Sequence, residues 1–118
     1  MIPLLTAGAM AAAGARPLRF TGLFTTSSAS SPVTSSTRTI EGTGTLLFNN
    51  IAGVTVSVQY SKNGGAFTTI TEGLTLAMTN GDTLAVRSTI AVVSQTTTFD
   101  IRNNAGSVLI EAVTLTRT

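Results

Sequence analysis

The chain contains no cysteine, no histidine and no tryptophan. Without cysteine it cannot form a disulfide, a thiolate zinc site or a thiol nucleophile, and its redox compartment cannot be read from cysteine usage. Without histidine it lacks the side chain that most often acts as an acid or base near neutral pH and most often binds metals. These absences remove the commonest catalytic and metal-binding chemistries.

Charged residues are also scarce, at 10% of the chain. Seven Lys and Arg against five Asp and Glu give a net charge of +2, and the basic residues are scattered, with no cluster after Arg19. A nucleic-acid surface needs several cations gathered into one patch, because its affinity comes from many phosphate contacts. The sequence therefore predicts no nucleic-acid partner.

Five carboxylates are available for catalysis or metal binding, and no two are closer than ten residues: Glu41, Glu72, Asp82, Asp100 and Glu111. A glycosidase needs two carboxylates about 5 to 10 Å apart, in a cleft lined with aromatic rings that this chain hardly supplies. The Ser and Thr residues lack an activating base, because there is no His and only one Lys. We predict no catalytic, metal-binding or cofactor-binding residue, and hence no enzymatic activity.

What the chain does contain is 23 Thr and 11 Ser among 118 residues, with 42% apolar residues. Thr is β-branched and suits the half-exposed surface of a pleated sheet, whereas Ala, Leu, Glu and Lys dominate helical proteins. A chain of this length is typical of one domain with a two-layer core. The composition therefore indicates one all-β domain, which we place at residues 17–118.

The first 16 residues differ from the rest, because residues 7–15 are all Ala, Gly or Met. The segment is too short and too rich in Gly and Pro for a membrane-spanning helix, so we predict no membrane span. A signal peptide would need a positive charge ahead of the apolar stretch, although residues 13–15 imitate a cleavage site. We interpret residues 1–16 as an extended arm that becomes ordered against neighbouring subunits.

The stretch after the arm predicts a first strand at residues 18–24 and then a Ser/Thr-rich loop at residues 25–39, because hydroxyl and Pro side chains bury too little to hold a packed element. From Thr39 onward, polar and apolar residues alternate as in half-buried strands. Further strands are expected at residues 40–48, 54–60, 66–70, 74–78, 83–87, 97–102 and 107–116.

Turn residues separate these strands at the spacing of a sandwich. The pattern predicts an antiparallel β-sandwich of immunoglobulin-like (Ig-like) type, with a jelly roll as the alternative. The expected core comprises Ile40, Val54, Val56, Val58, Phe67, Leu76, Leu84, Val86, Phe99, Ile101, Ile110 and Leu115. The five Phe residues are spread about one to a strand, which favours core packing over a ligand platform.

Three turns are predicted, at residues 62–65, 80–82 and 103–106. Asp82 is expected to close its own turn by hydrogen bonds to the backbone rather than to hold calcium. The apolar run 108–110 breaks the alternation, which suggests a bulge, an edge crossover or a strand covered on both faces. Residues 42–44 (Gly-Thr-Gly) lack the Lys and Ser or Thr of a phosphate loop, and they indicate an irregular strand instead.

Arg87 and Arg102, which lie in expected strands beside inward-facing residues, are expected to form solvated or inter-subunit salt bridges with Asp100 or Glu111. Neither is interpreted as a ligand-binding residue.

Residues 58–67 (VQYSKNGGAF) and 80–88 (NGDTLAVRS) together resemble a pattern found in Ig-like modules of bacterial surface proteins and bacteriophage structural proteins. The similarity covers about residues 53–117. It implies an Ig-like sandwich with a scaffold or attachment role and no catalytic residues. The small-residue N-terminus is likewise similar to the docking arms of phage virion proteins.

Two functions follow as hypotheses. The first is a non-enzymatic structural subunit of a bacteriophage virion, in a capsid decoration, a head-fibre base or a tail. It would contact copies of itself and neighbouring virion proteins through residues 1–16. The alternative is a carbohydrate- or surface-binding Ig-like module of a secreted or cell-surface bacterial protein. That alternative calls for an aromatic platform or an acidic calcium cluster, and the sequence shows neither.

Overall fold

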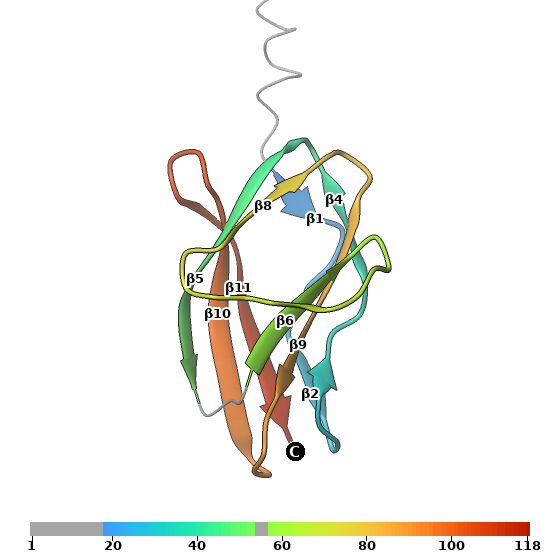
Figure 1. The fold of residues 1–118 in the computed structure, drawn as a ribbon, viewed down its shortest axis with the longest axis vertical. Coiled ribbons are helices and arrows are strands. Elements are labelled where there is room, and N and C mark those ends of the chain that lie inside the picture. The colour runs from blue at the N-terminus through green and yellow to red at the C-terminus, as the bar shows by residue number, and fades with distance from the viewer. Residues whose placement is uncertain (1–17, 54–56) are drawn as a thin grey trace, which may run out of the picture.

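The computed structural model describes residues 18–53 and 57–118, and all the regular structure in these ranges is β (Figure 1). The eleven strands are β1 (Arg19–Phe20), β2 (Thr26–Ser28), β3 (Val33–Thr34), β4 (Arg38–Glu41), β5 (Gly44–Gly53), β6 (Ser57–Lys62), β7 (Thr68–Thr69), β8 (Thr75–Met78), β9 (Thr83–Thr89), β10 (Gln95–Asn103) and β11 (Val108–Arg117). No helix within the described ranges is long and apolar enough to cross a membrane. The predicted arm, residues 1–16, lies outside them.

The strands form two sheets that pack face to face, which confirms the predicted all-β sandwich. One sheet has the order β1-β4-β9-β6-β7, with β3 also pairing with β9, and the other has the order β2-β11-β10-β5-β8. The expectation of purely antiparallel pairing is wrong at one place, because β2 runs parallel to β11. Alternation along a strand shows which side chains face inward but does not show which strand lies beside it.

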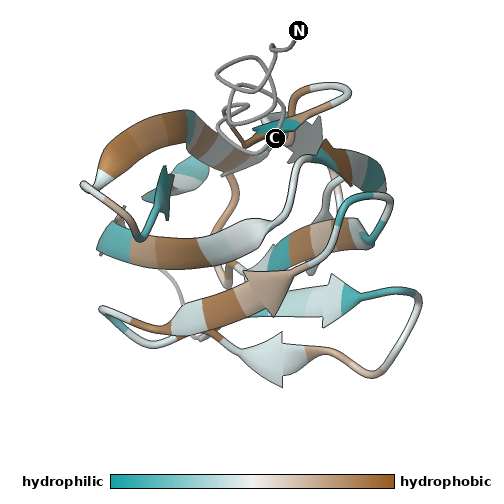
Figure 2. Cartoon of the chain, turned by 90° about the horizontal axis from the view of Figure 1, so that it is seen from above, coloured by the Kyte–Doolittle hydropathy of each residue, from teal (hydrophilic) through white to brown (hydrophobic). Residues whose placement is uncertain are grey.

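Apolar side chains from both sheets fill the space between them, and Figure 2 shows hydrophobic and hydrophilic positions alternating along the strands. Seven predicted core residues are buried: Ile40, Val58, Leu84, Val86, Phe99, Ile101 and Leu115. Two more, Leu76 and Ile110, are half-buried and pack against this core. Val54 and Val56 lie outside the described residues. Phe24 and Phe48 are buried too, as the distribution of the Phe residues predicted. The core also contains buried residues that the sequence did not single out, including Val33, Leu46, Ile90 and Val113.

Phe67 is the one predicted core residue that the structure places elsewhere. It precedes the two-residue strand β7, in a stretch that is mostly exposed, and its ring is half-exposed. The guanidinium carbon of Arg87 lies 3.8 Å from the ring centroid. A cation can bind the face of an aromatic ring at this distance, so Phe67 packs on the surface, and the expectation that all five Phe serve the core holds only in part.

The predicted strand 40–48 is two strands in different sheets, β4 and β5. The chain passes from one sheet to the other at residues 42–44, where Gly42 has φ = 93°. A Cβ on Gly44 would lie 2.9 Å from Leu18 Cδ1. The predicted irregularity at these glycines is therefore confirmed, and its cause is a crossing between the two sheets.

The Ser/Thr-rich stretch 25–39 is not simply a loop, because it contains β2, β3 and the start of β4. Val33 is fully buried, and the Ser35 hydroxyl oxygen accepts the Val86 N–H at 3.0 Å. The first strand, in turn, covers only Arg19–Phe20 of the expected 18–24. Hydroxyl-rich segments look like loops in sequence, yet here tertiary hydrogen bonds satisfy their backbone and hydroxyl groups.

Of the three explanations left open for the run 108–110, the structure shows the bulge. Ile101 pairs with Glu111 while Arg102 pairs with Leu109, so Ile110 is the extra residue on β11. One additional residue changes which side chains face inward beyond it. The hairpin turns at residues 62–65 and 103–106 are confirmed too, because they join β6 to β7 and β10 to β11.

Candidate functional site

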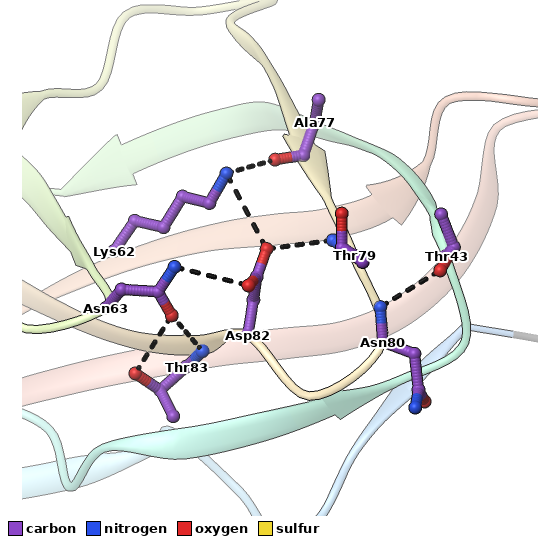
Figure 3. A network of polar contacts seen from close by, with 8 residues as sticks. All are labelled: Thr43, Lys62, Asn63, Ala77, Thr79, Asn80, Asp82 and Thr83. Carbon is purple, nitrogen blue, oxygen red and sulfur yellow. Dashed lines mark hydrogen bonds and ion pairs between the residues drawn. The ribbon is translucent and has the colours of Figure 1, made fainter.

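The turn at residues 62–65, within the first motif of the similarity described above, and the turn at residues 79–82, where the second motif begins, meet in one polar network (Figure 3). Asn63 and Gly64 have positive φ angles of 53° and 74°, and the Gly65 N–H donates to the Lys62 carbonyl at 3.0 Å. Positive φ at both central residues is the geometry that matches the twist of a β-hairpin. The Asn-Gly pair therefore sets the first turn.

The second turn closes through the Asp82 N–H, which donates to the Thr79 carbonyl at 2.9 Å, with Gly81 at φ = 95°. The Asp82 carboxylate also accepts the Thr79 N–H at 2.8 Å, as predicted from the sequence. This turn is a crossing between sheets, because β8 and β9 belong to different ones.

Side chains join the two turns to each other (Figure 3). Asn63 donates through its amide nitrogen to Asp82 at 3.2 Å and accepts the Thr83 N–H at 2.8 Å. The Lys62 ammonium lies 3.6 Å from Asp82 and donates to the Ala77 carbonyl at 2.8 Å. The network thereby ties β6 and β9 of one sheet to β8 of the other, and we call it the clasp.

The Thr79 N–H, followed by the Asn63 amide, lowers the pKa of the Asp82 carboxyl below its usual value of 3.8. The folded chain thus holds the Asp82 proton less tightly than the unfolded chain does, so this stabilisation is complete above pH 3.8 and disappears as pH falls through the lowered pKa. We expect Asp82→Asn to lower the urea midpoint at pH 7, with a difference from wild type that shrinks toward pH 2.5. A difference independent of pH would contradict the assigned hydrogen bonds.

A second cluster lies on the outer face of the other sheet, where Arg102 donates to Asp100 at 2.9 Å. The Asn50 amide donates to the same carboxylate oxygen at 2.7 Å. The Asn50 amide, followed by Arg102, lowers the pKa of Asp100 below 3.8. The predicted pairing of Arg102 is therefore confirmed within the chain. The pairing predicted for Arg87 is wrong, because Arg87 donates to Gln59 at 2.7 Å and covers Phe67.

Glu111 is the carboxylate whose role the sequence did not show. It pairs with the buried Ile101 across the sheet and so faces inward, half-buried at the sandwich edge, where it accepts the Phe24 N–H. The spacing of Glu111, Val113 and Leu115 is the signal that could have placed it on the inner face. Burial raises the pKa of Glu111 above its usual value of 4.5, against the opposing effects of the Phe24 N–H and Arg38.

The raised pKa of Glu111 makes stability depend on pH in the opposite direction to the lowered pKa of Asp82. Because the folded chain holds this proton more tightly than the unfolded chain, the contribution of Glu111 to stability increases as pH falls through the raised pKa toward 4.5. We expect the stability of wild type relative to Glu111→Gln to rise when urea titrations are moved from pH 8 to pH 4.5. A relative stability that falls over this range would contradict the buried, inward orientation.

The other two carboxylates also bind groups of the chain itself. Glu72 accepts the N–H groups of Asn50 and Ile51 at 2.9 and 3.0 Å, and Glu41 pairs with Arg19. Across residues 18–53 and 57–118, no three of the acidic residues gather in a group that could hold a metal ion. Each of the five carboxylates therefore accepts hydrogen bonds from the chain itself or pairs with one of its cations.

Large apolar side chains are exposed at three places. Val108 and Leu109 begin β11, Leu23 lies between β1 and β2, and Val92 and Val93 occupy the β9–β10 connection. In the sequence, the run 108–110 indicated only a break in the alternation, and the exposure of Val108 and Leu109 could not be predicted from it.

Comparisons with protein families, with curated proteins and with solved structures find no match for this chain.

Proposed function

We propose that the protein is a non-enzymatic structural subunit of a larger assembly, and specifically a bacteriophage virion protein that contacts its neighbours through residues 1–16. The observation that carries the proposal is an uncharged segment of small apolar residues joined to a folded domain at an end that exposes apolar side chains. Such a segment gains by leaving water, and it has too few large side chains to build a core of its own.

The position of Leu18, the first described residue after the arm, supports the proposed assembly role. Leu18 is buried against Gly44, and the next residue of β5, Thr45, accepts the Asn104 N–H at 2.9 Å through its carbonyl. Leu18 therefore lies near the β10–β11 hairpin, and Figure 1 shows that β1, which begins at the next residue, is at the same end of the sandwich as this hairpin. The exposed Val108 and Leu109 follow directly after that hairpin turn.

The contacts of the acidic residues support the non-enzymatic part of the proposal, since each is engaged by donors of the chain itself. The Ig-like class is likewise part of the proposal, and its support is the similarity over residues 53–117 together with the two-sheet sandwich. The alternative, a surface-binding Ig-like module, calls for an open aromatic platform. The ring of Phe67 is covered by Arg87, which favours the structural role.

The arm can be tested by deleting residues 2–15. We expect the full chain to form oligomers in light scattering after size exclusion, and we expect the deleted protein to be a monomer with an unchanged far-ultraviolet circular dichroism spectrum. The physical reason is that the deletion removes uncharged apolar surface and no described core residue. The matched control replaces residues 2–15 by a Gly/Ser linker of equal length, which should also be monomeric.

Two outcomes would contradict the proposal. If the full chain is monomeric at all concentrations, the assembly role fails. If the deleted protein unfolds, residues 2–15 belong to the domain itself. The virion location is tested separately with antibodies against the domain, because labelling of released phage particles supports it and labelling confined to the bacterial surface supports the alternative module.

A further inference from the structure

The edges of the two sheets are not equally protected. An unpaired strand edge offers backbone N–H and C=O groups to any other extended chain, and proteins limit this by short edge strands or by a Lys at the edge. The edge strands β1, β7 and β2 contain only two, two and three residues. The edge strand β8 has its Ala77 carbonyl covered by the Lys62 ammonium.

β11 differs from these strands, and its protection on this side is limited to β2 and to the bulge at Ile110. It contains ten residues, but β2 pairs only with Leu115, Thr116 and Arg117. On that side the Thr114 N–H donates to the Thr25 hydroxyl at 3.2 Å and the Thr118 N–H to the Ser28 carbonyl at 2.8 Å. Since alternate N–H groups of a strand point the same way, the Ala112 N–H also points to this edge. No strand of the described ranges pairs with residues 108–113 there.

Three large apolar side chains are exposed around this open edge, and the cation Arg38 lies beside it, where its Nε donates to the Leu23 carbonyl at 2.9 Å. Val108, Leu109 and Leu23 are 63%, 47% and 68% exposed. Leu23 lies beside the edge because its neighbour Phe24 donates to Glu111. That hydrogen bond also holds the half-buried Glu111 carboxylate against the backbone of the chain, beside Arg38, so that it does not extend freely from the edge.

We propose that the open edge of β11, residues 108–113, receives part of residues 2–15 of a neighbouring copy as an added strand. This inference rests on the proposed function and names the surface on which the arm docks. In strand addition, backbone hydrogen bonds supply the affinity and the flanking side chains supply the selectivity. The Ala112 N–H would donate to a carbonyl of the arm, and Val108, Leu109 and Leu23 would cover its apolar side chains.

The arm fits this edge in length and in chemistry. Six residues of β11 span about 20 Å, whereas 14 residues of extended chain reach about 46 to 50 Å, so part of the arm can pair while the rest bridges two subunits. No side chain of the arm between residues 2 and 15 is charged, which suits the exposed apolar side chains of this edge. Its Ala and Gly residues, with a methyl side chain or none, allow close approach to Leu109 and Ala112.

The absence of cysteine allows a clean disulfide test on the full chain. Single variants carry Cys at Ala112 on the edge or at Ala7, Ala9, Ala11 or Ala13 in the arm, and edge and arm variants with different tags are mixed and oxidised. A disulfide needs Cα atoms about 4.4 to 6.8 Å apart. The matched control is Ala77→Cys, an exposed alanine on β8, the opposite edge strand of the same sheet.

We expect disulfides between differently tagged chains for Ala112→Cys with at least one arm variant, at a yield several times that of Ala77→Cys. Ala112→Pro, which removes the edge donor, should weaken oligomer formation while the dichroism spectrum stays that of wild type. Disulfides that form only within one chain, in a variant carrying both Cys, would overturn docking onto a neighbour.

The failure of this inference can be told apart from the failure of the proposed function. If the oligomer depends on residues 2–15 but Ala112→Cys links no better than Ala77→Cys, the arm docks elsewhere and the strand-addition proposal is wrong. If the full chain is monomeric and forms no disulfides, both proposals are wrong. If Ala112→Pro unfolds the domain, the disulfide yields alone decide.

Discussion

Phe99→Ala should lower the free energy of unfolding by about 3 to 5 kcal/mol, a large share of the 5 to 15 kcal/mol typical of natural domains. Phe99 is 1% exposed, pairs with the buried Val113 across the sheet, and lies with its ring centroid 6.3 Å from that of Phe48. Truncation would leave a cavity between two sheets whose backbone hydrogen bonds resist collapse, so the lost contacts are not replaced. Urea unfolding at pH 7 measures the change.

The matched control is Phe67→Ala, which removes the same side chain from the surface. Its ring is half-exposed and its specific contact is with Arg87. A cation over an aromatic ring at an exposed site contributes about 0.5 to 1 kcal/mol, so we expect a loss of about 1 kcal/mol. Equal losses for the two variants would mean that Phe99 is not at the centre of the core.

Gly53→Ala is expected to destabilise the domain by at least about 3 kcal/mol, through backbone strain and a steric clash together. Gly53 ends β5 with φ = 111°, opposite Thr97 of β10. A Cβ at this position would lie 2.1 Å from the Thr96 carbonyl oxygen and 2.9 Å from the Thr97 Cα. Both obstacles are backbone atoms of a central strand, so relief requires β5 and β10 to separate.

Gly73→Ala separates the two effects. Gly73 also has positive φ, 86°, but a Cβ there would meet no atom within 4 Å. It should therefore show only the cost of a left-handed backbone, about 1 to 2 kcal/mol. Thermal and urea unfolding of both variants give the comparison. If Gly73→Ala is as damaging as Gly53→Ala, close approach of β10 is not the reason for glycine at position 53.

Lys62 connects the clasp to the edge of the five-stranded sheet, and this connection bears on the proposed assembly. Its ammonium covers the Ala77 carbonyl of β8 and lies beside Asp82. Within residues 18–53 and 57–118, the clasp covers one carbonyl at the β8 edge of the five-stranded sheet, whereas no strand pairs with residues 108–113 of β11 on the other side. If β11 receives the arm as proposed, this difference between the two edges would favour strand addition at β11, which is the property that ordered assembly needs.

Local chemistry made several features predictable from the sequence alone. The two Asn-Gly turns follow from residues that accept positive φ, and the backbone hydrogen bond of the Asp82 carboxylate reaches only three residues back. The alternation of Leu84 and Val86, and of Phe99 and Ile101, placed their side chains in the core because successive residues of a strand face opposite sides. Absence of Cys and His excluded whole classes of chemistry without any structure.

Only the tertiary structure decided what depends on contacts between distant residues. The inward orientation of Glu111 depends on pairing with Ile101 and on the Phe24 N–H, 87 positions earlier. The split of residues 40–48 between two sheets depends on packing around Gly44, and the exposure of Phe67 depends on Arg87. The open edge of β11 follows from how few residues β2 pairs with. Sequence periodicity specifies the faces of a strand, whereas its neighbours are chosen by the packing of the whole chain.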